Sequence, residues 1–217
     1  MLDRLRARIT HKDVLFVYDS ASPWTVYRCD NQAEALDYVG LSSDVVQIDQ
    51  IDLAAAAARY DVVILNRIDD ENRVAGLLEP ARRADKSVLF AADDLLFAPA
   101  VPSHFAFLDE ATESDRETWW RRLEAWRATL EACGAAIVST EPLAEHARKH
   151  VPWVGVVYNA VSAEMVAMAD EVGPRARNRR HPHQSRLEVL HTALALREGV
   201  VALERGEADV DLRGKLR

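Results

Sequence analysis

The sequence predicts an α/β protein with a Rossmann-like, doubly wound parallel sheet, and three observations predict it. Six short runs rich in valine, isoleucine and leucine alternate with helical segments between residues 14 and 172, which indicates parallel strands joined by helical crossovers. The runs are continuously apolar, as expected of strands covered on both faces. Hydrophobic residues make up 49% of the 217 residues, enough for one substantial core.

Each predicted strand is a short apolar run that ends at polar residues. In chain order, the strands are expected at residues 14–19, 44–48, 61–65, 87–92, 135–139 and 154–157. The first three helices follow the first three strands, over residues 26–39, 53–60 and 71–84. Gly40 provides a C-terminal cap for the first of them. Pro80 predicts a kink or a break in the third, because proline lacks the N–H that a helix interior needs.

The fourth helix is predicted over residues 113–133, with Gly134 as its stop. Its apolar side chains recur at helical spacing and indicate a face packed on the sheet: they are Trp119, Leu123, Trp126 and Leu130. Trp120, Arg121 and Arg122 fall off that face. We interpret them as a surface cluster, with an acceptor groove or a membrane interface as the alternatives.

The last two helices of the alternation are predicted over residues 140–150 and 158–172. Thr140 is expected as the N-cap of the former, with Pro142 in its first turn. His146 and His150 stand four residues apart on it, but no HExxH motif accompanies them, so we predict no metal site.

The domain organisation follows from a change of composition after Gly173. We expect an N-terminal lead-in over residues 1–13, the Rossmann-like domain over 14–173, a basic linker over 174–186, and a helix with a loose tail over 187–217. Formal charge follows the same division, with −12 over residues 1–173 and +4 over residues 174–217.

Composition also limits the partners. An acidic body argues against nucleic-acid binding, which needs a basic face. The chain has no apolar run long enough to span a bilayer and no secretory signal, so we expect a cytoplasmic protein in which peripheral membrane contact stays open. Cys29 and Cys133 stand alone and indicate reduced thiols. The eight glycines form neither GxGxxG nor GxxxxGK[ST], so no dinucleotide or P-loop cofactor is expected.

The candidate site is read from the ends of the strands, because ligands of open α/β sheets bind outside the carboxyl ends. With the strand order 3-2-1-4-5-6, the first and fourth strands would flank one crevice, placing the loop DSASPW beside the acidic pair. Candidates for a catalytic role are Asp93, Asp94 and His104. Candidates for binding an acceptor or other ligand are Asp19, Ser20, Ser22, Arg28, Asn66, Arg67, Thr140, Glu141 and Asn159.

Five of the candidates also have a structural interpretation. Asp93 or Asp94 would cap the following turn. Arg28 would pair with Asp30, and Arg67 with Asp69 or Asp70, for little stability. His104 would be an ordinary loop histidine.

Several segments fall in an order that resembles the N-terminal half of a GT-B glycosyltransferase of the family 4 (retaining) type. They are YRCDNQAEAL (27–36), VVILNRI (62–68), VLFAADDLLF (88–97), HFAFL (104–108) and AAIVSTEPLAEHA…VYNAV (135–161). The resemblance covers residues 13–172. It implies an acceptor-binding domain facing a second domain that grips a nucleotide-sugar donor through two glutamates separated by seven residues. That spacing is absent after Gly173, where only 44 residues follow.

The expected function is therefore the acceptor-binding half of a glycosyltransferase. Such a domain would act on a sugar, lipid or peptide acceptor, and a second chain would carry the donor domain. Nucleotide sugar would be a substrate, and no cofactor is expected. The alternative is a non-catalytic binding or scaffold module with the same fold. A phosphorylation receiver domain is disfavoured, because only Asp19 follows the first strand where an acidic pair is needed.

Overall fold

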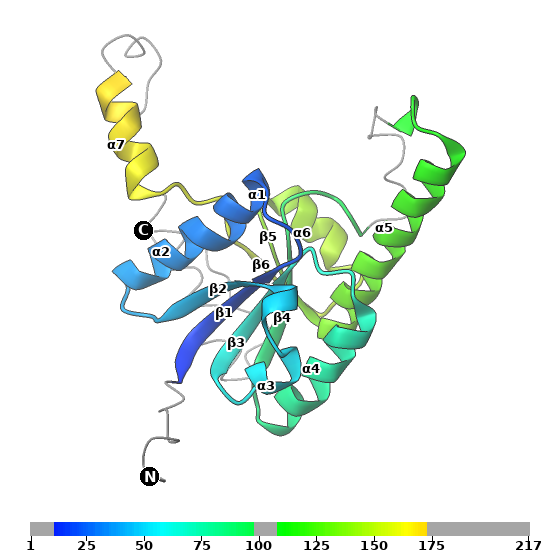
Figure 1. The fold of residues 1–217 in the computed structure, drawn as a ribbon, viewed down its shortest axis with the longest axis horizontal. Helices are drawn as coiled ribbons and strands as arrows, with labels where there is room; N and C mark the ends of the chain where they lie inside the picture. The colour runs from blue at the N-terminus through cyan, green and yellow to red at the C-terminus, as the bar shows by residue number, and fades with distance from the viewer. Residues whose placement is uncertain (1–10, 98–107, 173–217) are drawn as a thin grey trace.

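A computed structural model describes residues 11–97 and 108–172, which form one six-stranded, all-parallel sheet with helices on both faces (Figure 1). This confirms the predicted fold class. The strands are β1 (Lys12–Tyr18), β2 (Ser43–Gln47), β3 (Tyr60–Asn66), β4 (Ser87–Ala92), β5 (Ala135–Val138) and β6 (Trp153–Val156). The helices are α1 (Pro23–Thr25), the π-helix η1 (Val26–Asp30), α2 (Asn31–Tyr38), the 3₁₀ helix η2 (Ile48–Gln50), α3 (Leu53–Ala56), α4 (Glu71–Arg83), α5 (Glu113–Cys133), α6 (Glu141–Ala147) and α7 (Ala163–Val172).

The order of the strands is β2-β1-β3-β4-β5-β6, so the expected order 3-2-1-4-5-6 is wrong. Strand β3 lies between β1 and β4, and β1 pairs with it over six positions from Lys12 to Tyr18. Both orders occur in doubly wound sheets. The apolar pattern of a strand reports burial on both faces and does not distinguish its neighbours. The switch point therefore lies between β1 and β3.

Several helices differ from their predicted bounds. The first helical segment starts at Pro23, and α3 ends at Ala56, because Tyr60 already pairs with Lys12 in the sheet. Pro80 does not end α4, which continues to Arg83 with its apolar face, including Ala81, still buried. The chain from Val157 onward stays non-helical until α7. The lead-in differs by two residues, since β1 begins at Lys12. The linker and tail predicted over 174–217 lie outside the described residues.

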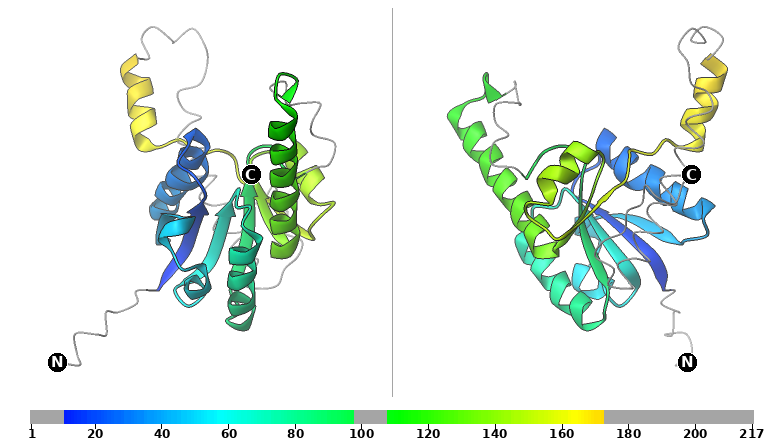
Figure 2. Two further views of the ribbon diagram at one scale, coloured as in Figure 1. Left: turned by 45° about the vertical axis from the view of Figure 1, so that its right-hand side comes forward. Right: turned by 180° about the vertical axis from the view of Figure 1, so that it is seen from behind.

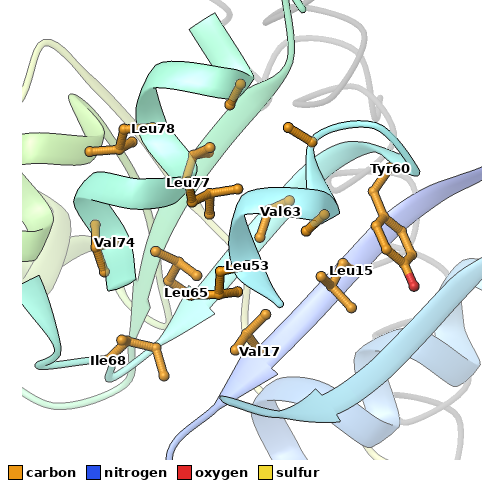
Figure 3. Close-up of a cluster of buried hydrophobic side chains, with 14 of the residues drawn as sticks. Leu15, Val17, Leu53, Tyr60, Val63, Leu65, Ile68, Val74, Leu77 and Leu78 are labelled. Carbon is orange, nitrogen blue, oxygen red and sulfur yellow. The ribbon is translucent and has the colours of Figure 1, made fainter. Parts of the chain in front are cut away.

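The core is divided by the sheet into two sides. On one side, α3 and α4 cover a cluster that includes Leu15, Val63 and Leu77 (Figure 3), and α5 and α6 cover the neighbouring cluster around Phe90 and Trp126. On the other side, η1 and α2 cover a cluster with residues from β1, β3, β4 and β5. Figure 2 shows helices on both sides of the sheet. Burial on both faces accounts for the continuous apolar runs.

Edge strand β6 carries Gly155 beneath its own tryptophan. A Cβ built on Gly155 would lie 2.8 Å from the Trp153 ring, which is closer than two carbon atoms approach. Trp153 and Gly155 are two residues apart and so share one face of the strand. The tryptophan thus packs over its own strand.

Helix α5 has a defined signal at each end. Thr112 and Asp115 form a reciprocal capping box at its start. Gly134 follows its last residue with φ of 71°, in the left-handed region that favours glycine. Gly76, inside α4, instead has helical geometry and open space where a Cβ would lie.

Exchange of these two glycines for alanine is expected to have opposite effects. Gly134→Ala should destabilise the fold by about 1 kcal/mol, because alanine is strained at positive φ. Gly76→Ala should stabilise it by about 0.5–1 kcal/mol, because alanine restricts the unfolded chain and favours helix. Urea denaturation of both variants measures the difference, and equal effects would contradict the assigned helix end.

Ion pairs connect neighbouring strands at their amino-terminal ends. Asp44 accepts hydrogen bonds from Lys12 Nζ at 2.6 Å and from Tyr60 Oη at 2.8 Å. Burial raises the pKa of Asp44, but the bonds from Lys12 and Tyr60 outweigh it, so the pKa is lowered overall. Asp61, paired with Lys86 and His11, has a pKa lowered in the same way against its burial.

These carboxylates should contribute stability above about pH 4 that is lost as the pH falls through their lowered folded pKa values. Asp44→Asn should cost about 1 kcal/mol or less at pH 7, since the pair is partly solvated. The cost should shrink as the pH falls below about 4, because the carboxyl takes up a proton first in the unfolded chain and then, at lower pH, in the folded one. Denaturation at pH 3, 4 and 7 measures it, and a cost that does not depend on pH would refute the role of the charge.

Candidate functional site

The candidate site lies at the carboxyl ends of the central strands, around the switch point between β1 and β3. Helices α5 and α7 project beyond this edge of the sheet on either side of it (Figures 1 and 2). Side chains from the loop after β1, from the ends of β3 and β4, and from α5 meet here.

Arg67, directly after β3, is the central residue. Its guanidinium pairs with Asp93 and, at 2.6 Å, with Asp94. The side chains of Arg67 and Asp93 are 12% and 13% exposed, whereas Asp94 is 58% exposed. The backbone of Arg67 has φ of 53°, in the left-handed region that is uncommon for a residue with a side chain. Such strain is typical of functional positions.

Two tryptophans from different parts of the chain hold Arg67 in place. Its guanidinium carbon lies 4.7 Å from the centre of the Trp24 ring, a cation–π contact with the loop after β1. Trp126 on α5 donates from Nε1 to the carbonyl oxygen of Arg67 at 2.7 Å. The backbone N–H of Arg67 also donates to Ala91 of β4 at 3.1 Å. Arg67 therefore connects four elements of the edge.

Arg122 forms a second ionic cluster beside the first. It donates to Asp69 at 2.7 Å and to Asp19 at 3.3 Å, and its guanidinium lies 4.8 Å from the centre of the Trp126 ring. Asp19, a predicted ligand-binding residue at the end of β1, is thus paired with α5. The buried Trp126 contacts both arginines and so links the two clusters.

Arg28 lies behind this surface and is completely buried. It does not pair with Asp30. Its Nη1 donates to the carbonyl oxygen of Val157 at 2.6 Å and contacts Asn159 Oδ1 at 3.5 Å. Burial, opposed by the charge of Asp93, lowers the pKa of Arg28 to about 10, so it is a cation at neutral pH.

The segment after β6 is held against α2 by further bonds. Asn31 Nδ2 donates to the carbonyl oxygen of Ala160 at 2.8 Å, and the N–H of Ala163 donates to Glu34 Oε1 at 2.9 Å. Residues 157–163 are therefore anchored over η1 and α2. This arrangement places Asn159, a predicted binding residue, beside Arg28.

The remaining candidates are distributed less tightly. Ser22 occupies the N-cap position of α1 without a side-chain capping bond; its hydroxyl lies 3.0 Å from Thr25 Oγ1, which donates to the carbonyl oxygen of Ser20. Thr140 occupies the predicted N-cap position, although its side chain makes no capping bond, and Glu141 pairs with Arg148 at 3.4 Å. His104 lies outside the described residues.

Cys29, next to Arg28 in η1, is buried. Burial raises the pKa of Cys29 to about 12, so its thiol stays protonated. Asn66, buried at the end of β3, lies beside that thiol. No group of three or more histidine, cysteine or acidic side chains that could hold a metal ion occurs within residues 11–97 and 108–172.

An open hollow at the end of β2 lies outside this site. It is lined by residues 49–54 with Arg73 and Gly76. Arg73 is already bonded to the carbonyl oxygen of Ile48 at 2.9 Å, and Asp52 caps α3. Since its polar groups serve local structure, we place the functional site at the switch point instead.

Sequence reasoning missed Trp24 and Asp69 as site residues, and placed Arg122 in a surface cluster. Trp24 belongs to the DSASPW segment, two residues after Ser22. That position is the signal by which the sequence could have identified it as a site residue. Arg122 follows Trp119 by three residues, and only the true strand order shows that this side of α5 meets β1 and β3.

Comparison with known proteins leaves the family open. No protein-family model and no curated protein matches the chain. Among solved structures, a match is found to the TIR domains of the activated Roq1 resistosome that recognises the effector XopQ, with 13% identity and a TM-score of 0.32, over 55% of this chain and 83% of that one. So distant a likeness identifies no ligand. In the part of the chain that the structure describes, no helix is both long and apolar enough to cross a membrane.

The two aspartates should differ in their effect on stability. Asp93→Asn should cost about 3 kcal/mol, because it leaves the guanidinium of Arg67 without its buried partner. Asp94→Asn, at an exposed carboxylate, should cost less than about 1 kcal/mol. Denaturant unfolding of the two matched variants measures both costs. Equal losses would show that the Arg67–Asp93 pair is not the structural one.

Proposed function

We propose that this chain is an acceptor-binding domain of the glycosyltransferase type, which holds a hydroxyl-bearing acceptor for transfer of a sugar from a nucleotide donor with retention. The segments that resemble the family 4 N-terminal half include β3, β4 and the DDLLF segment that carries Asp93 and Asp94. A second domain, in another chain or elsewhere, would bind the donor. Sugars are the favoured acceptors.

One observation carries the proposal: a partly exposed tryptophan lies against a fixed cation beside two carboxylates. Trp24 is 39% exposed and stacks on Arg67, which Asp93 and Asp94 hold in place. A sugar ring has apolar C–H faces that pack on an indole and hydroxyl groups that donate to carboxylates. The exposed Asp94 carboxylate has acceptor capacity beyond its single bond to Arg67.

In this function the residues of the site would orient the acceptor rather than react with it. Asp94 would accept a hydrogen bond from an acceptor hydroxyl, and Trp24 would fix the plane of the ring. Arg67 would supply positive charge close to the phosphate that departs from the donor. Orientation and fixed charge of this kind account for large parts of enzymatic rate enhancement.

The second candidate is a non-catalytic binding module. It is favoured because the charged side chains at this edge already pair with one another. Arg67 pairs with Asp93 and Asp94, and Arg122 pairs with Asp19 and Asp69. Calorimetric titration with UDP-glucose and GDP-mannose tests whether this chain binds a donor on its own, which the proposed acceptor domain does not require. Binding of neither donor would count against an autonomous enzyme.

The acceptor role predicts that one of two equally exposed tryptophans matters. Trp24→Ala should weaken binding of simple sugars about tenfold, because it removes the stacking face. Trp120→Ala is the matched control, since Trp120 is 38% exposed on α5 and outside the residues of the site. NMR titration of the chain with glucose, mannose and galactose measures both.

Two results would contradict the proposal. One is the absence of binding by all three sugars at millimolar concentration. The other is equal binding by the two tryptophan variants, which would place any sugar away from Trp24.

A further inference from the structure

Arg28 is a buried cation without a counter-ion. Its side chain is 0% exposed, and its partners are the neutral carbonyl of Val157 and the amide oxygen of Asn159. No carboxylate forms an ion pair with it among the described residues. The carboxylate whose charge acts on it is that of Asp93, and Asp93 is already engaged by Arg67.

The free donors of Arg28 lie on one edge of its guanidinium. Nη1 is used, whereas Nε and Nη2 are buried without a hydrogen-bond partner. Nε and one terminal nitrogen form the planar fork with which arginine binds two oxygens of a carboxylate or a phosphate. This edge of Arg28 therefore presents the pair of donors that an oxyanion would accept from.

A second buried side chain repeats the pattern. Gln32 is 0% exposed, and both its Nε2 and its Oε1 lack partners. It follows Arg28 by four residues along η1 and α2, so the two share a helix face. Buried polar atoms without partners are rare in folded proteins, and each one left unsatisfied costs free energy. Three donors unsatisfied on one helix face indicate a ligand that supplies acceptors.

One exposed side chain contacts this cluster. Asn159 is exposed, and its side chain touches Arg28 Nη1 at 3.5 Å, near the limit of a hydrogen bond. Arg28 is thus linked to the surface through Nη1. The π-helical turn of η1, a geometry frequent at functional sites, carries Arg28 to this position.

We propose that Arg28 and Gln32 form a subsite for an oxyanion, the phosphate or carboxylate group of a small ligand. The Nε and Nη2 atoms of Arg28 donate to two oxygens of the anion, and Gln32 Nε2 donates to it from the same helix face. Asn159 forms the rim. This subsite extends the proposed function and depends on it for one point, that the ligand is the acceptor. The evidence for the subsite itself is the buried Arg28 cation.

The test uses the full chain and four probes at constant ionic strength set with chloride: inorganic phosphate, acetate, glucose and glucose 1-phosphate. Side-chain NMR signals of Arg28 Nε–H and of the Gln32 amide are followed, with melting temperature as a second readout. Phosphate or acetate should shift both signals and raise the melting temperature of the wild type. Which of the two binds more tightly distinguishes a phosphate ligand from a carboxylate.

The variants are Arg28→Gln, Gln32→Leu and Arg116→Gln. Arg28→Gln should weaken anion binding at least about tenfold, since it removes the charged fork. Gln32→Leu should weaken it while leaving the bond from Arg28 to Val157 in place. Arg116→Gln is the control, because Arg116 bonds to Leu108 at the start of α5 and should bind the anion as the wild type does.

The inference is overturned if neither phosphate nor acetate perturbs the Arg28 and Gln32 signals of the wild type. It is also overturned if a folded Arg28→Gln binds them as tightly as the wild type. Should Arg28→Gln fail to fold, the wild-type signals and Gln32→Leu decide. Anion binding without any glucose binding would count against the sugar acceptor and support the subsite, whereas glucose binding without anion binding would do the reverse.

Discussion

The edge of this molecule depends on how Arg67 is held. Its backbone adopts a left-handed conformation that a side chain normally disfavours. Bonds from Trp126 to its carbonyl and from its N–H to Ala91 keep it there, and the pair with Asp93 and the ring of Trp24 fix its guanidinium. If Arg67 were released, the loop after β1, the end of β4 and helix α5 would lose their common contact.

The central position of Arg67 follows from the topology. With β3 between β1 and β4, the residue after β3 is flanked by both loops that carry polar side chains. The same placement brings Arg122 of α5 within reach of Asp19 and Asp69. The two arginines thereby pair with four carboxylates, whereas the buried Arg28 bonds to neutral oxygens.

The sequence predicts the strands well because burial on both faces leaves continuous apolar runs, as in VVIL of β3. It does not predict their order, since Val62 and Val63 are buried whichever strand lies beside them. Because strands are predicted and their order is not, the sequence identifies only part of the candidate site. Strand ends identify Asn66, Arg67 and Asp93, but the partner of Arg67 is set by strand order and by its backbone conformation, which the residue type does not reveal. Trp24 and Gln32 contribute through a loop and a helix, where strand-end reasoning does not look.

Strand β6 has consequences beyond the site, because within the described residues it pairs with β5 alone. An outer strand offers unpaired backbone groups to other chains, and proteins limit this risk in several ways. Here the strand has four residues, and one is a glycine covered by the Trp153 ring of the same strand. A short, glycine-containing strand is a poor template for a neighbouring chain. The short length and the covered glycine of β6 therefore oppose self-association along this edge of the sheet, although the strand carries no charged residue.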